Sequence, residues 1–221
     1  SRPKNNKEAI VFVEHTMSLL FFAIIVISIL FYFTMPYIIT ALAPGFVNNP
    51  HVFELAVHFG KIVFPYLLFI ALVAQFCSIT NTYNRFALCA FAPSLLNIAF
   101  IGSLLFFTPY VATAGHALSY GVLLGGVAQF ILMYYAIYKL QITPVLVFPR
   151  IDDNIRKFLK LFFPGIMGAA AIQLNIIAGT IIASFLPSGA ISHLYYADRI
   201  NQLPLAIFGI ALGVALLPTL S

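Results

Sequence analysis

The chain has 221 residues, of which 62% are hydrophobic and only 8% are charged, with a formal net charge of +5. A soluble domain carries roughly 25% charged residues to cover its water-facing surface, so this composition excludes an ordinary soluble domain. The basic residues stand in short gaps between apolar runs, which also argues against a nucleic-acid partner. The composition predicts an all-α transmembrane helix bundle, because a helix satisfies its own backbone hydrogen bonds in lipid.

Six apolar runs are long enough to cross a hydrocarbon core of about 30 Å as helices. Most of the gaps between them hold prolines, glycines or asparagines that end helices. In chain order the runs cover about residues 17–42, 62–80, 90–107, 117–138, 161–185 and 203–217, the last extended upstream from residue 195.

Lysine and arginine are concentrated in every second gap, which is typical of cytoplasmic loops. They occur before the first run, at Arg85 after the second, and between residues 139 and 160 after the fourth. We therefore expect these segments in the cytoplasm, and the gaps at Pro44, Pro109 and Pro187 on the outside. This alternation supports six crossings.

The gap at residues 139–160 is longer than the others. Apolar residues recur there at helical spacing, at Ile155 and Phe158, beside the basic Arg156 and Lys157. The pattern predicts either a short amphipathic helix on the inner leaflet or an ordinary charged connector. We expect residues 1–160 to hold four spans and this connector, and residues 161–221 to hold the last two spans.

Arg199 is the most informative polar residue, because it stands where the last span begins. An arginine inside a membrane costs about 2.5–3.5 kcal/mol on insertion scales, so it is expected to face a bundle interior or a wet cavity. Its planar guanidinium suits phosphate oxygens, which favours an anion-binding role. The alternatives are pairing with Asp198 or extension to the outer headgroups.

Uncharged amides within the spans are candidates either for joining neighbouring helices or for lining a wet cavity. The glycine pairs Gly121/Gly125, Gly165/Gly168 and Gly209/Gly213 predict close helix packing. The amide residues in question are Asn97, Gln129, Gln173 and Asn175, with Gln75 as a further case.

Reactive groups are scarce in this sequence. Cys77 and Cys89 show no paired-ligand spacing and are interpreted as small apolar residues, with neither a disulfide nor a metal site expected. No nucleophile elbow, phosphate loop or HExxH motif is present, so we expect a protein that is not an enzyme and has no cofactor.

A series of short motifs carries a family resemblance through nearly the whole chain. The motifs are residues 43–46 (APGF), 64–66 (FPY), 81–86 (NTYNRF), 91–98 (FAPSLLNI), 183–189 (ASFLPSG), 195–199 (YYADR), 209–213 (GIALG) and 216–221 (LLPTLS). In order and spacing they resemble the MurJ (MviN) family of bacterial lipid II flippases, within the multidrug/oligosaccharidyl-lipid/polysaccharide exporter superfamily.

The resemblance implies a transporter of about fourteen spans in two lobes around a central cavity, working by alternating access. This chain would be a fragment matching about the third to the eighth span, with residues 1–160 in the first lobe and residues 161–221 running into the second. Arg199 falls on one of the family's cavity arginines. Some relatives are thought to bind sodium through an acid in the span matching residues 161–185, which here has no Asp or Glu.

The implied cargo is lipid II, an undecaprenyl-diphosphate-linked disaccharide peptide needed for cell-wall synthesis. The implied location is the bacterial cytoplasmic (inner) membrane, with membrane lipids as the other partners. Two alternatives stay open from the sequence: an exporter of another polyprenyl-linked sugar or drug, and a membrane scaffold that transports nothing.

Overall fold

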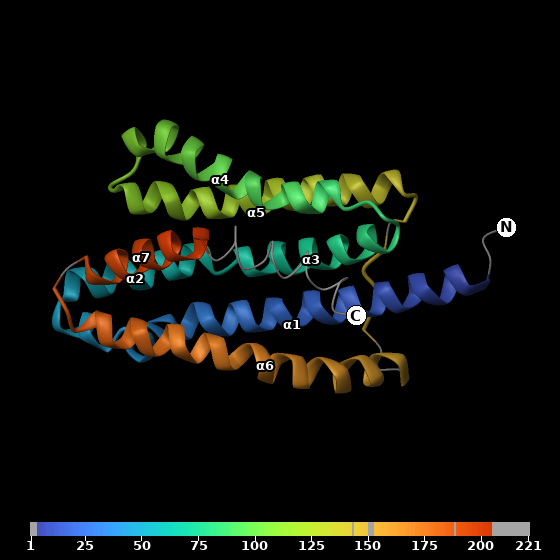
Figure 1. Cartoon of the computed structure of the whole chain (residues 1–221), viewed down its shortest axis with the longest axis horizontal. Helices are drawn as coiled ribbons and strands as arrows, with labels where there is room; N and C mark the ends of the chain where they lie inside the picture. Colours follow the sequence, from blue (N-terminus) through green and yellow to red (C-terminus); the bar gives the residue numbers. More distant parts are fainter. Residues whose placement is uncertain (1–3, 143, 150–152, 188, 205–221) are drawn as a thin grey trace. The chain divides into compact units, whose positions relative to one another are not determined.

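The computed structural model describes residues 4–142, 144–149, 153–187 and 189–204 (Figure 1). Helices make up all the regular structure among these residues. Two short 3-10 helices, η1 and η2, stand between longer α-helices. In chain order the elements are α1 (Lys4–Leu42), η1 (Pro44–Asn48), α2 (Pro50–Val63), α3 (Tyr66–Thr82), α4 (Ala87–Phe107), η2 (Thr108–Tyr110), α5 (Ala114–Lys139), α6 (Asp153–Ser184) and α7 (Ala190–Pro204).

Among the described residues, five helical stretches are long and apolar enough to cross a bilayer, which confirms an all-α, polytopic protein. They coincide with the first five predicted spans, and each begins earlier in the chain than predicted. The sixth predicted span, residues 203–217, lies almost wholly outside the described residues. The five stretches are Ile10–Leu42, Pro50–Thr82, Ala87–Tyr110, Ala114–Lys139 and Ile155–Ser184.

The second span is built from two helices, α2 and α3, with a break at Phe64 and Pro65. The N–H of Phe64 still donates to the carbonyl of Gly60 at 2.9 Å, but the N–H of Leu67 turns back to Phe64 at 3.0 Å. Pro65 has no N–H with which to continue the helical pattern. The proline therefore separates an outer helix from an inner one within a single crossing.

The described residues form two compact units. One comprises the chain up to Ile38 together with Glu54–Gly168, and the other comprises Ile39–Phe53 together with the residues from Ala169 onward. The predicted boundary between two lobes, at residues 160 and 161, stays a prediction.

The first unit is held together by α5, against which both α3 and α4 pack. Gly121 and Gly125 let α5 approach α4 closely, because a β-carbon at Gly121 would overlap the hydroxyl of Ser103 and one at Gly125 would press on Leu96. The close packing predicted for this glycine pair is therefore present. A β-carbon at Gly165 or Gly168 would meet nothing within 4 Å among the described atoms.

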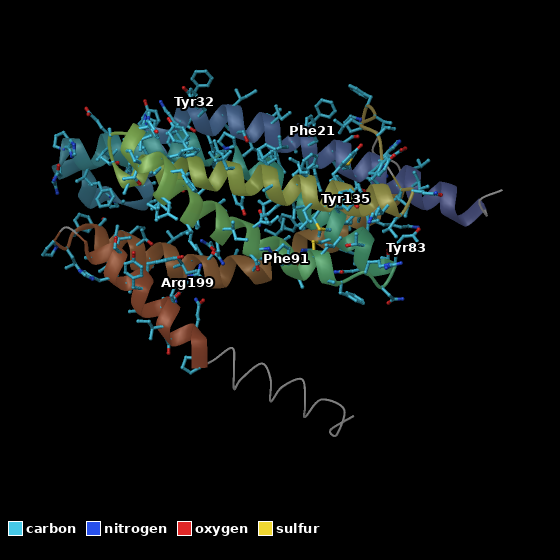
Figure 2. All side chains as sticks on the ribbon, turned by 90° about the horizontal axis from the view of Figure 1, so that it is seen from above. Phe21, Tyr32, Tyr83, Phe91, Tyr135 and Arg199 are labelled. Carbon is cyan, nitrogen blue, oxygen red and sulfur yellow. A yellow bond between two sulfur atoms is a disulfide. The ribbon has the colours of Figure 1, made fainter. Side chains whose placement is uncertain are left out.

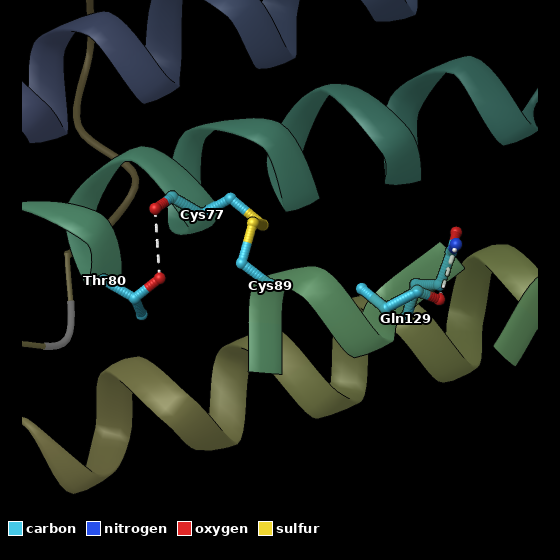
Figure 3. The surroundings of a disulfide bond; sticks show 5 residues. Cys77, Thr80, Cys89 and Gln129 are labelled. Atoms are coloured by element: carbon cyan, nitrogen blue, oxygen red, sulfur yellow. Dashed lines mark hydrogen bonds between the residues drawn. A yellow bond between two sulfur atoms is a disulfide. The ribbon is translucent and has the colours of Figure 1, made fainter. Parts of the chain in front are cut away.

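The expectation of two unpaired cysteines is wrong, because Cys77 and Cys89 form a disulfide (Figure 3). Cys77 lies near the end of α3 and Cys89 lies in the first turn of α4, and their Cα atoms are 5.3 Å apart. The tight turn between the two helices brings the residues opposite each other. Their separation of 12 residues matches no sequence motif, so only the folded hairpin reveals the pair.

α3 and α5 end in the same way, each with a non-glycine residue in the left-handed conformation. Asn84 and Gln141 both have φ of 56°. After α5, the N–H of Ile142 donates to Ile137 at 3.2 Å and the N–H of Gln141 donates to Tyr138 at 2.9 Å. This pattern is a Schellman motif, which satisfies the last carbonyls of a helix.

In Figure 1 the α3–α4 turn and the end of α5 lie at the same end of the first unit as the start of α1. A hydrogen bond from Gln75 of α3 to the carbonyl of Val13 in α1, at 3.1 Å, agrees with this arrangement. Arg85 and Lys139 therefore belong to one end of the unit, as the alternation of basic gaps predicts.

The amphipathic stretch predicted before the fifth span does not form a separate helix. α6 begins at Asp153 and continues to Ser184, so Ile155, Arg156 and Phe158 lie in its first turns. Residues 144–149, which precede it, form no helix.

In the second unit, the main chain of η1 packs directly against the main chain at the end of α6. η1 approaches the end of α6 so closely that a β-carbon on Gly45 would overlap the carbonyl of Ser184. The N–H of Gly45 also donates to the Ser184 hydroxyl at 3.0 Å. Only glycine allows this approach.

Candidate functional site

The predicted anion-binding residue, Arg199, lies on α7. This helix follows a turn in which Gly189 takes a positive φ of 96°. The N–H of Ala190 donates to Pro187 at 3.1 Å, and the N–H of His193 donates to Gly189 at 2.9 Å. The turn thus starts a helix directly after α6 ends.

Arg199 is held by two neighbours on its own helix. Its Nε donates to the hydroxyl of Tyr195 at 3.0 Å, and its Nη1 donates to Oε1 of Gln202 at 3.4 Å. The guanidinium carbon also lies 5.1 Å from the centroid of the Tyr195 ring, within cation–π range. These partners stand four residues before and three residues after the arginine, where side chains share a helix face.

Asp198 is held by a different bond. Its Oδ2 accepts a hydrogen bond of 2.7 Å from Nε2 of Gln202. Gln202 therefore stands between the carboxylate and the guanidinium, and no described contact joins Arg199 to Asp198 directly.

The side chain of Arg199 is exposed on α7 (Figure 2). A guanidinium has five N–H donors, and the bonds to Tyr195 and Gln202 use two of them. The arrangement presents a pre-oriented cation that is able to bind an anion through parallel hydrogen bonds.

Gln129 occupies a different kind of place, in the core of the first unit. It is only 2% exposed. Its Nε2 donates to the carbonyl of Ala92 at 2.9 Å, and its Oε1 accepts from the hydroxyl of Tyr66 at 3.3 Å. One side chain on α5 thus joins α3 and α4, which favours the helix-joining role for Gln129.

Three of the other predicted amides, Asn97, Gln173 and Asn175, are exposed. Asn97 is on α4 in the first unit, and Gln173 and Asn175 are on α6 in the second. No described contact brings Gln173 or Asn175 to Arg199, so their part in a cavity stays a prediction.

Sequence reasoning missed two partners of the arginine, Tyr195 and Gln202. The signal was present, because both stand at helical spacing from Arg199. It also missed Tyr66 as the partner of Gln129, since 63 residues separate them and no local pattern joins them.

Comparisons with known proteins agree with the fold. The sequence model of the family described as "Lipid II flippase MurJ" matches residues 1–221. The chain is 35% identical over 213 residues to "Lipid II flippase MurJ" of Burkholderia cenocepacia, covering 95% of this chain and 41% of that protein. It is 40% identical over 176 residues to "Probable lipid II flippase MurJ" of Haemophilus influenzae, covering 78% of this chain and 34% of that protein.

A third relative is the "Probable lipid II flippase MurJ" of Buchnera aphidicola subsp. Acyrthosiphon pisum, which is 35% identical over 221 residues, covering 99% of this chain and 43% of that protein. The chain thus spans about two fifths of the length of the curated relatives it matches. Five helices of spanning length and these relatives identify a multi-pass protein of the inner membrane. Because the family model covers every residue, the chain belongs to the lipid II flippase MurJ family.

Proposed function

We propose that the protein containing this sequence moves lipid II from the inner to the outer leaflet of the cytoplasmic membrane. The support is membership of the MurJ family, whose named relatives are lipid II flippases, and a chain of membrane-spanning helices. The relatives' names favour this cargo over a drug or another polyprenyl-linked sugar.

The proposed mechanism is alternating access, in which no covalent bond is made or broken. Cationic groups attract the diphosphate of the carrier into a hydrated cavity, while the polyprenyl tail stays in lipid. Rocking of two lobes then opens the cavity to the outside. The protein is thus proposed to be a transporter and not an enzyme.

One observation supports the proposed role of Arg199. Its guanidinium is exposed and is oriented by Tyr195 and Gln202. An arginine already neutralised by a carboxylate would attract a diphosphate weakly, whereas this one keeps donors that match phosphate oxygens. Arg199 is therefore proposed to bind the diphosphate of the cargo.

The test is an Arg199→Ala substitution in the full-length protein, with translocation of labelled lipid II measured in reconstituted vesicles. Hydrogen bonds to charged groups contribute about 1.5–3 kcal/mol. We therefore expect flipping to fall roughly tenfold or more at low cargo concentration. Arg199→Lys is expected to be intermediate, because it keeps the charge but loses the planar pair of donors.

Arg85→Ala is the matched control, because it removes an exposed arginine from the α3–α4 turn. Its flipping rate is expected to equal that of the wild type. Normal flipping by Arg199→Ala at equal expression would exclude the proposed role of this residue. Flipping of another polyprenyl-linked sugar but not of lipid II would exclude the proposed cargo.

A further inference from the structure

A short non-helical segment between α5 and α6 is attached to α1 through its main chain. We call residues 144–149 (Pro-Val-Leu-Val-Phe-Pro) the strap. Prolines at both ends disfavour a helix, and valines favour an extended chain. The strap connects the helices of the first unit to the start of α6.

Two side chains of α1 accept hydrogen bonds from the strap. The N–H of Val145 donates to Oε1 of Glu14 at 3.2 Å, and the N–H of Val147 donates to the hydroxyl of Ser18 at 2.9 Å. Ser18 is 0% exposed, so its hydroxyl lies fully within the packed structure. Both acceptors belong to α1 and both donors are backbone amides.

The spacing of the two bonds explains why they form together. Residues four apart on a helix are separated by about 6 Å along its axis. Residues two apart on an extended chain are separated by about 6.5 Å. Glu14 and Ser18 are four apart, and Val145 and Val147 are two apart, so the acceptors and the donors are in register.

The large side chains of Leu146 and Phe148 contribute little to holding the strap in place. Leu146 is 51% exposed and Phe148 is 84% exposed. The backbone of the strap, by contrast, donates the two hydrogen bonds to Glu14 and Ser18. Removing an acceptor on α1 is therefore expected to release the strap.

Both flanks of the strap are packed in the same unit. Before it, Ile142 belongs to the buried cluster that includes Met17 of α1. After it, Ile155 of α6 is 1% exposed, and the ring of Phe158 meets the ring of Phe12 edge to face at 6.2 Å. The first half of α1 thus contacts the chain before, within and after the strap.

We propose that Glu14 and Ser18 are positioning residues for transport, which hold the strap on α1 and thereby fix where α6 begins. α6 is the helix that leads along the chain to α7 and Arg199. The docking of the strap stands on the structure alone, while its consequence for transport rests on the proposed function.

The first measurement is hydrogen–deuterium exchange of the peptide covering residues 144–149 in the full-length protein. Glu14→Ala removes an acceptor, so we expect exchange of the strap to accelerate about tenfold. Glu14→Gln keeps an amide oxygen in the same place, and we expect it to restore protection. Glu54→Ala, which removes an exposed carboxylate from α2, is the matched control and should leave the strap unchanged.

The second measurement is translocation of labelled lipid II by the same variants. We expect Glu14→Ala to reduce the flipping rate several-fold and Glu14→Gln to recover it. Ser18→Ala is expected to act like Glu14→Ala. If the substitution of the buried Ser18 prevents folding, the Glu14 variants alone test the proposal.

The outcomes separate the two proposals. Unchanged strap exchange in Glu14→Ala would overturn the docking by Glu14, and faster exchange with unchanged flipping would overturn the positioning role. Failure of the wild-type protein to move lipid II, with a protected strap, would instead overturn the proposed function and leave the docking intact.

Discussion

At the scale of single residues, polar side chains in this protein differ in what surrounds them. Gln129 is enclosed by three helices and uses both ends of its amide, while Asn97 on the neighbouring α4 is exposed. A polar group in an apolar core stabilises the fold only when it is hydrogen-bonded. Replacement by leucine is therefore expected to destabilise the fold at Gln129 and to have no effect on stability at Asn97.

Replacing Gln129 by Leu keeps the volume but removes both hydrogen bonds, leaving the hydroxyl of Tyr66 without its partner. Interhelix hydrogen bonds in membranes contribute about 0.6–2 kcal/mol, so we expect the melting temperature in detergent to fall by a few degrees. Asn97→Leu is the control and should leave the melting temperature unchanged. Equal melting temperatures for Gln129→Leu and the wild type would show that this amide does not join the helices.

At the scale of the elements, α3 and α4 are tied to each other by the disulfide and to α5 by packing. A cavity of about 460 Å³ lies beside the cysteines, and Gln129 also lines it. The cross-link therefore bridges two helices at a place where their side chains leave space. A disulfide closing a loop of this size stabilises a fold by about 3 kcal/mol in the chain-entropy view.

Isolation in air-saturated buffer without reductant is expected to leave both cysteines inert to a maleimide–polyethylene glycol reagent. Reduction with dithiothreitol should then allow two adducts, seen as a stepwise mobility shift. A Cys77→Ser variant, which keeps one cysteine, shows where the band with a single adduct runs. Two adducts on the wild-type protein after oxidation, without reductant, would disprove the disulfide.

At the scale of the whole molecule, the distribution of charge sets the orientation in the membrane. Basic residues gather at one end of the first unit, with Arg85 in the α3–α4 turn and Lys139 at the end of α5. The opposite end of α4 leads into η2, which ends at the 87% exposed Tyr110. The positive-inside rule predicts that Arg85 lies in the cytoplasm and Tyr110 outside.

This orientation is testable in a background of Cys77→Ser and Cys89→Ser. A membrane-impermeant thiol reagent added to intact spheroplasts should label Tyr110→Cys and not Arg85→Cys. Permeabilised cells should give labelling of both, which controls for accessibility. Labelling of Arg85→Cys in intact spheroplasts would mean that the chain is inserted the other way round.

The sequence predicted the first five spans well because hydrophobicity over a long run is a local property. The close packing at Gly121 was predictable for the same reason, since small residues at fixed spacing mark a helix contact. The disulfide, the partners of Gln129 and the docking of the strap were not, because each joins residues that only the folded chain brings together. Arg199 was singled out by its cost in lipid, and its binding role stays a prediction. Its contact with Tyr195 was within reach of the sequence, because the two residues stand four apart on one helix.

The break at Pro65 has a consequence for motion. In an unbroken helix, changing the angle between its two halves strains or breaks hydrogen bonds at the bend. Here the proline supplies no donor for the carbonyl of Lys61, so that bond does not exist to be lost. A change in the angle between α2 and α3 therefore costs no hydrogen bond donated by residue 65, and the second crossing carries a joint partway along its length.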